Sequence, residues 1–137
     1  MRVEYGELKI GKVAQKHLND VINSNWASTG PKVQAFEEGW GKIFGYKYNK
    51  AVSSGTDAGI NAVMAFYENK RKRGEHVIVP ALSFIATSNA VLAAGFIPRF
   101  VDIEIQTMNI NPEGIKEAIS PNVAGIKAVH TMGKMCR

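Results

Sequence analysis

The sequence predicts an α/β fold, in which a mainly parallel sheet is flanked by helices. From Glu75 onward, short apolar runs alternate with helical patterns, which is typical of repeated strand–helix–strand units. The 137 residues, 45% of them hydrophobic, are enough for one domain with a buried core. The chain contains no internal repeat and no low-complexity linker. We therefore expect a single domain over residues 1–137.

Two helices are expected first. Residues 11–22 carry apolar side chains at helical spacing, which predicts an amphipathic helix that ends at residues 23–25. Turn-forming residues at 26–31 predict a loop, and Pro31 is suited to the first turn of a second helix that Gly45 ends. The side chains expected to face inward from the first helix are Val13, Leu18, Val21 and Ile22.

A third helix is expected after the small residues Ser54, Gly55 and Thr56, because apolar residues recur at near-helical spacing from residue 58 to 67. The first N–H groups of a helix are unpaired and lie at its positive dipole end. They suit a phosphate, which glycine lets approach closely. The alternative is that Ser54 or Thr56 only caps the helix.

Three strands and two helices are expected in the rest of the chain. The strands are predicted at residues 76–80, 97–103 and 124–130. One helix is expected from residue 85 or 86 to 94, where Gly95 ends it. The other is expected to begin with Asn111 as its cap and Pro112 at its first position, and to continue to Ile119.

Ligands of open parallel sheets bind beyond the carboxyl ends of the strands. Besides the segment 54–56, this rule draws attention to Ser83 and Phe84, to Asp102 and to His130. Phe84 could present a flat apolar face to a ring, or it could belong to the core. Asp102 could be only a turn residue, and His130 could be a structural histidine.

Composition excludes several classes of function. The net charge of +5 is moderate, and the basic run at residues 70–73 fits an exposed helix end, so no nucleic-acid partner is expected. Cys136 is the only cysteine, so neither a disulfide framework nor a cysteine-based metal site is expected, and a reducing compartment fits. With no signal peptide and no apolar stretch of ~20 residues, we expect a cytoplasmic protein without a membrane partner.

Taken in order, several blocks of the chain resemble the DegT/DnrJ/EryC1/StrS sugar aminotransferases. The resemblance implies pyridoxal-phosphate enzymes of the aspartate-aminotransferase fold that move an amino group, usually from glutamate, onto a keto-sugar linked to a nucleotide. It covers nearly the whole chain. The blocks are residues 26–31 with Phe36 and Glu37, and residues 54–58, 77–87, 95–103, 109–112 and 129–133.

The resemblance also implies roles for single residues. Gly55 and Thr56 would hold the phosphate of pyridoxal 5'-phosphate, in a phosphate-binding segment that begins at Ser54. Phe84 would stack on the pyridine ring of the cofactor. The loop of Thr29, Gly30 and Pro31 would lie near the sugar. Residues 1–45 would then form an N-terminal helical segment with the substrate loop, and residues 46–137 a truncated cofactor-binding α/β part. Gly59 departs from the family, which has a larger apolar residue there; glycine weakens a helix by up to ~1 kcal/mol relative to alanine.

In the family, the Schiff-base lysine, a nearby glutamine and the aspartate paired with the pyridine nitrogen follow beyond the position of Arg137. We therefore expect an incomplete large domain that has no catalytic residue of its own, is inactive alone and binds the cofactor weakly or not at all. Residues 51–53 would form its first strand. An unpaired strand edge at residues 124–130 would favour a homo-oligomer, and a complementing chain could carry the lysine. The alternative is a complete, short, non-catalytic homologue that acts as a binding or assembly module.

Overall fold

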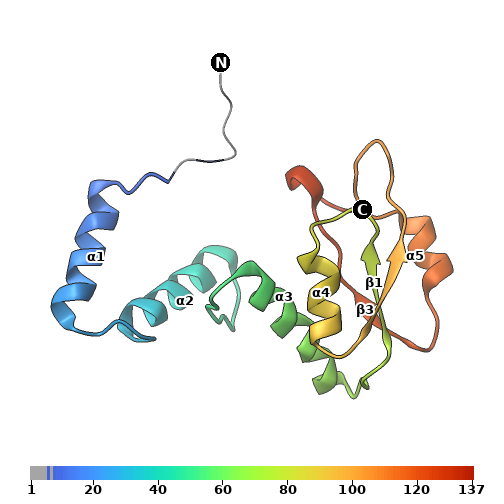
Figure 1. Cartoon of the computed structure of the whole chain (residues 1–137), viewed down its shortest axis with the longest axis horizontal. Helices are drawn as coiled ribbons and strands as arrows, with labels where there is room; N and C mark the ends of the chain where they lie inside the picture. The colour runs from blue at the N-terminus through green and yellow to red at the C-terminus, as the bar shows by residue number, and fades with distance from the viewer. Residues whose placement is uncertain (1–5, 7) are drawn as a thin grey trace. The chain divides into compact units, whose positions relative to one another are not determined.

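The computed structural model describes residue 6 and residues 8–137. Contacts divide the chain into two compact units, Met1–Ala51 and Val52–Arg137, each of which is described by itself (Figure 1). The first unit is helical, and the second carries the sheet.

The first unit contains α1 (Lys12–Ser24) and α2 (Pro31–Phe44), which confirms the two expected helices. Asn25 ends α1 in the left-handed conformation, with φ 53°. Pro31 is at the first turn of α2, and Gly45 ends it at φ 72°, as its sequence predicts.

The expected inward face of α1 is not buried, and this prediction is wrong. Val13, Leu18 and Ile22 are 71%, 53% and 68% exposed, and α1 contains no buried residue. An apolar stripe is buried only where another element covers it, and inside this unit α1 and α2 enclose no core. The stripe therefore predicted the helix correctly but not its environment.

The second unit is built around a three-stranded parallel sheet of order β2-β1-β3, which confirms the predicted sheet. Its strands are β1 (His76–Pro80), β2 (Ile97–Val101) and β3 (Val123–Ile126), so β2 and β3 end earlier than expected. Beyond β2, Ile103 turns away to form an isolated antiparallel bridge with Ile110. Residues 51–53 are not a strand, because no neighbouring strand in the described chain pairs with them.

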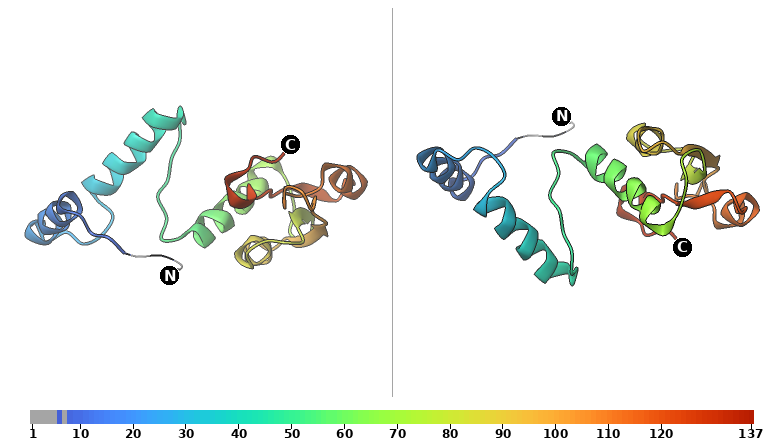
Figure 2. Two further views of the ribbon diagram at one scale, coloured as in Figure 1. Left: turned by 90° about the horizontal axis from the view of Figure 1, so that it is seen from above. Right: turned by 90° about the horizontal axis from the view of Figure 1, so that it is seen from below.

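Helices cover both faces of this sheet (Figures 1 and 2). On one face lie α3 (Gly55–Met64), which continues as the 3₁₀ helix η1 (Ala65–Asn69), and α4 (Ala86–Ala93); on the other lies α5 (Pro112–Ala118). A second 3₁₀ turn, η2 (Thr131–Gly133), follows β3.

Side chains of β1 alternate between the two faces, as the pleat of a strand requires. Val77 and Val79 join one buried cluster, whereas Ile78 joins the other. The first cluster also contains Val63, Val91, Ala94 and Phe96, and the second contains Val101, Ile110, Ala118 and Val123. Because β1 is buried on both faces, its sequence is a continuous apolar run.

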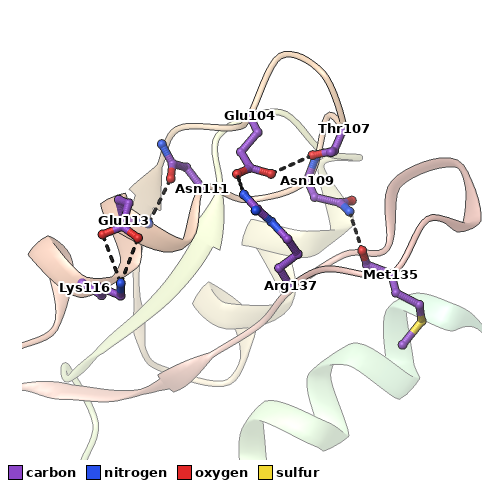
Figure 3. A network of polar contacts seen from close by, with 8 residues as sticks. All are labelled: Glu104, Thr107, Asn109, Asn111, Glu113, Lys116, Met135 and Arg137. Carbon is purple, nitrogen blue, oxygen red and sulfur yellow. Dashed lines mark hydrogen bonds and ion pairs between the residues drawn. The ribbon is translucent and has the colours of Figure 1, made fainter.

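A buried amide fastens the segment that follows β3 (Figure 3). Asn109 is only 3% exposed. Its Nδ2 donates to the carbonyls of Lys134 and Met135, at 3.0 and 3.1 Å, and its Oδ1 accepts from the amide of Thr131 at 2.9 Å. One side chain thus fixes both ends of this segment against the loop between β2 and α5.

Candidate functional site

The first turn of α3 has both a cap and free donors. Ser54 is its N-cap, and the Ser54 Oγ accepts from the amide of Asp57 at 3.1 Å, so Ser54 does cap the helix. Among the described residues, no acceptor bonds the amides of Gly55 and Thr56. The cap therefore leaves two adjacent N–H groups available to an anion, as the phosphate hypothesis requires.

The space before these amides is open. Ser54, Gly55 and Thr56 are all exposed. A Cβ placed on Gly55 would meet no atom within 4 Å. A phosphate can therefore approach the backbone here without a side chain in its way.

Asp57 is a charged neighbour whose effect the sequence analysis did not consider. Its Oδ2 accepts from the hydroxyls of Ser53 and Ser54, the latter at 2.8 Å. The hydrogen bond from Ser53 has the largest effect and the one from Ser54 the next, and both lower the pKa of the Asp57 carboxyl. Of the residues expected to bind phosphate, Ser54 thus has its hydroxyl engaged by a carboxylate, and an anion at the amides would experience the negative charge of that carboxylate.

Phe84 lies in the turn between β1 and α4. Its side chain is 78% exposed, so the alternative that it belongs to the core is wrong. The turn is held by the amide of Thr87, which donates to the Phe84 carbonyl at 2.9 Å, and by the hydroxyls of Ser83 and Thr87, 2.7 Å apart. One face of an aromatic ring is therefore available beyond the carboxyl end of β1.

The starts of α3 and α4 belong to the same edge of the sheet. α4 begins after the carboxyl end of β1, while α3 leads through η1 to its amino end. The two helices pack together, and the side chain of Lys127, the first residue after β3, reaches both. The amide of Gly55 thus lies at the start of α3, and the ring of Phe84 lies in the turn that leads into the neighbouring α4, as a common site would require.

Asp102 and His130 take the structural roles that the sequence left open. The Asp102 Oδ1 accepts from the amide of Ile103 at 2.8 Å, which is a turn interaction. The His130 Nδ1 accepts from the amide of Cys136 at 3.1 Å. Neither side chain has a recorded contact with Gly55, Thr56 or Phe84 in the part of the chain that the structure describes.

The predicted substrate loop lies in the first unit. The Trp26 Nε1 donates to the Thr29 carbonyl at 3.0 Å. A Cβ on Gly30 would lie 2.6 Å from that Nε1, so only glycine leaves the Trp26 ring in place. Gly30 and Pro31, with Trp26 and Val21, line a cavity of about 630 Å³. Thr29 contributes its backbone to the loop rather than a side chain to the cavity.

Two further features were sought in the described residues. None of the described helices combines the length and apolarity needed to cross a membrane. No cluster of three or more histidine, cysteine, aspartate or glutamate residues suited to a metal ion occurs there either.

Comparison with known proteins identifies what the chain is similar to. Residues 8–137 match the DegT/DnrJ/EryC1/StrS aminotransferase family. The 3-oxo-glucose-6-phosphate:glutamate aminotransferase of Bacillus subtilis (strain 168) is 42% identical over 117 residues, which are 85% of this chain and 26% of that protein.

Solved structures show the same fold. A GDP-4-keto-6-deoxy-D-mannose-3-dehydratase of E. coli with bound hydrated PLP superposes with a TM-score of 0.81 at 31% identity, over 89% of this chain and 32% of its own. NtdA of Bacillus subtilis with bound cofactor PMP superposes with a TM-score of 0.82 at 39% identity, over 89% and 27%. The chain therefore has the fold of part of the large domain of aspartate-aminotransferase-type enzymes, and spans about a third or less of these relatives.

Proposed function

The chain belongs to the DegT/DnrJ/EryC1/StrS aminotransferase family. We therefore propose that it forms the part of a pyridoxal 5'-phosphate site that binds the phosphate and stacks on the ring, in an enzyme that acts on keto-sugars. The observation that carries this proposal is the pair of unbonded amides at Gly55 and Thr56, open to solvent at the start of α3. The related E. coli dehydratase structure holds hydrated PLP and the NtdA structure holds PMP, and both molecules carry a phosphate.

Each part of the proposed site has a distinct task. The amides of Gly55 and Thr56 bind the phosphate, and the exposed face of Phe84 orients the ring. When bound, the cofactor supplies an electron sink for the bonds of a substrate carbon. Thr29, Gly30 and Pro31 are the proposed sugar loop. Gly30 leaves room for the Trp26 ring, and both residues line the cavity of the first unit.

The substrate we propose is a keto-sugar linked to a nucleotide. The E. coli dehydratase is named for a GDP-linked keto-sugar, whereas the Bacillus subtilis aminotransferase is named for a sugar phosphate and glutamate. Both names share a keto-sugar attached to a phosphoryl group. The relatives include both an aminotransferase and a dehydratase. The family's name favours amino transfer for the whole enzyme.

We further propose that residues 1–137 are inactive alone. The lysines of the described chain, such as Lys50, Lys127 and Lys134, match no catalytic motif of the family. β3 has a neighbour only on its β1 side among the described strands, so a second copy or a complementing chain could pair with its free edge. Glutamate-dependent amination of a keto-sugar nucleotide by the isolated chain would overturn this proposal.

Calorimetric titration with pyridoxamine 5'-phosphate tests the phosphate site. This probe has no aldehyde, so it cannot react with surface lysines. A Gly55→Val variant places a side chain before the amides without a clash in the fold. Because hydrogen bonds to charged groups are worth roughly 1.5–3 kcal/mol each, we expect the variant to bind at least about tenfold more weakly.

A matched control is Gly39→Val, since Gly39 is partly exposed on α2 and a Cβ there also meets no atom within 4 Å. The control should bind the probe as the unchanged chain does. Equal binding by the Gly55→Val variant would place the ligand elsewhere.

A further inference from the structure

Lys127 reaches from the sheet to the interface between α3 and α4. Its amide donates to the Ile78 carbonyl at 2.8 Å, so its backbone continues β3 along β1. Its Nζ lies 3.3 Å from the Thr87 carbonyl of α4. A Cβ on Gly59 of α3 would lie 2.6 Å from the same Nζ, so the absence of a side chain at Gly59 makes room for the ammonium group.

The charge of Lys127 is not neutralised by the protein. In the described chain it forms no ion pair, unlike Lys116, whose Nζ lies 2.8 Å from a Glu113 carboxylate oxygen. Partial burial lowers the pKa of the Lys127 amine, which means that its environment disfavours the charged form. Thr87 is in the first turn of α4, where the helix dipole also disfavours a cation.

The proposed phosphate site at the start of α3 needs a positive charge nearby. A phosphate at the amides of Gly55 and Thr56 would be close to the Asp57 carboxylate. Gly59 is four residues after Gly55, so the two residues lie about one helical turn apart, ~6 Å along the helix axis. A lysine side chain is flexible enough to shift toward an anion at that distance.

We propose that Lys127 supplies the positive charge that balances a phosphate bound at the start of α3, with Gly59 as the space that admits its ammonium group. The proposal rests on the function proposed above and adds a residue to the same site. It explains both why α3 has glycine at position 59 and why a half-buried lysine with no ion pair among the described residues reaches the interface between two helices.

A purely structural role would be different. Lysine stems often pack along apolar surface, and the hydrogen bond to Thr87 could stabilise the contact between β3 and α4. In that case the length of the side chain would matter to folding, but its charge would not matter to a phosphate. The two roles are separated by a neutral variant and a charged variant of similar length.

The test is calorimetric titration of the 137-residue chain and its Lys127→Met and Lys127→Arg variants with pyridoxamine 5'-phosphate and with pyridoxamine, which lacks the phosphate. We expect Lys127→Met to weaken binding of the phosphorylated probe by about fivefold or more, because a unit charge at this range is worth that much near a protein surface. Lys127→Arg should retain most of the affinity. Pyridoxamine should bind all variants alike, and Lys116→Met should behave as the unchanged chain.

The outcomes distinguish the two proposals. If Gly55→Val weakens binding but Lys127→Met does not, the role of Lys127 is wrong and the phosphate site stands. If Met and Arg variants lose affinity equally, Lys127 acts through packing, and the inference is also wrong. If Gly55→Val has no effect, both proposals fail. Urea unfolding of each variant shows whether it remains folded under the conditions of the titration.

Discussion

Asp57 is a negatively charged neighbour of the proposed phosphate site at the start of α3. Its carboxylate engages the Ser53 and Ser54 hydroxyls and lies beside the two free amides. Replacing it by asparagine removes the like charge and releases hydroxyl donors. We predict that Asp57→Asn binds pyridoxamine 5'-phosphate about three- to tenfold more tightly at pH 7, measured by calorimetry, because like charges at close range oppose binding. Weaker binding by the variant would show that the carboxylate instead orders the site.

The same carboxyl group predicts a pH dependence of stability. Hydrogen bonds from Ser53 and Ser54 lower its pKa in the folded chain, so folding favours its ionised form. The stabilisation is present above the unfolded pKa of about 3.9 and is lost as the pH falls through the lower folded value. The urea midpoint of the unchanged chain should therefore exceed that of Asp57→Asn at pH 6, and the difference should shrink below about pH 4. A difference that is constant with pH would contradict this account.

At the scale of the elements, Gly59 and Gly125 are predicted to respond in opposite ways to alanine. On α3, the new Cβ at Gly59 displaces only the flexible tip of Lys127 and meets Ala90 at 3.4 Å. Gly59→Ala should therefore raise the free energy of unfolding by up to ~1 kcal/mol through helix propensity. On β3, a Cβ at Gly125 would lie 2.4 Å from the Phe66 ring, so Gly125→Ala should lower it by about 1–3 kcal/mol. Urea denaturation measures both; destabilisation by Gly59→Ala would show that the position of Lys127 is rigid.

The segment after β3 depends on Asn109. Truncating this side chain removes one of the two acceptors of the Thr131 amide, which also donates to the Val129 carbonyl, and the donor to the Lys134 and Met135 carbonyls. We predict that Asn109→Ala lowers the free energy of unfolding by about 2–3 kcal/mol, since a buried side chain loses three hydrogen bonds worth roughly 1 kcal/mol each. Hydrogen exchange should increase at the Thr131 amide. Asn122→Ala, at an exposed site, is the control and should change stability little.

The sequence predicted elements best where local chemistry determines them. Pro31, Gly45 and Asn111 mark helix ends by their backbone preferences or side-chain caps, and the structure has those ends where expected. β1 was predicted with correct bounds because an apolar run buried on both faces has a strong pattern. The extent of β2 and β3 and the absence of a strand at residues 51–53 depend on pairing partners, which local patterns do not contain. The exposed stripe of α1 was missed for the same reason.

At the scale of the whole molecule, the candidate site was likewise predicted where local sequence determines it and missed where contacts between segments determine it. Ser54, Gly55 and Thr56 were predicted from local helix-start chemistry, and the structure places them at the start of α3. The exposure of Phe84, the carboxylate of Asp57 beside the amides and the reach of Lys127 to Gly59 arise from contacts between segments. Only the departure at Gly59 gave a signal for Lys127, because a small residue inside a helix indicates a close neighbour.

We propose that the amides of Gly55 and Thr56 bind the phosphate of the cofactor. Amide ¹H–¹⁵N NMR spectra of the 137-residue chain, recorded during titration with pyridoxamine 5'-phosphate and separately with pyridoxamine, test it most directly. We expect the Gly55 and Thr56 amide resonances to shift most with the phosphorylated probe and to stay unchanged with pyridoxamine, because a hydrogen bond to an anion strongly alters an amide resonance. Unchanged Gly55 and Thr56 resonances, with the largest shifts at another segment, would contradict it.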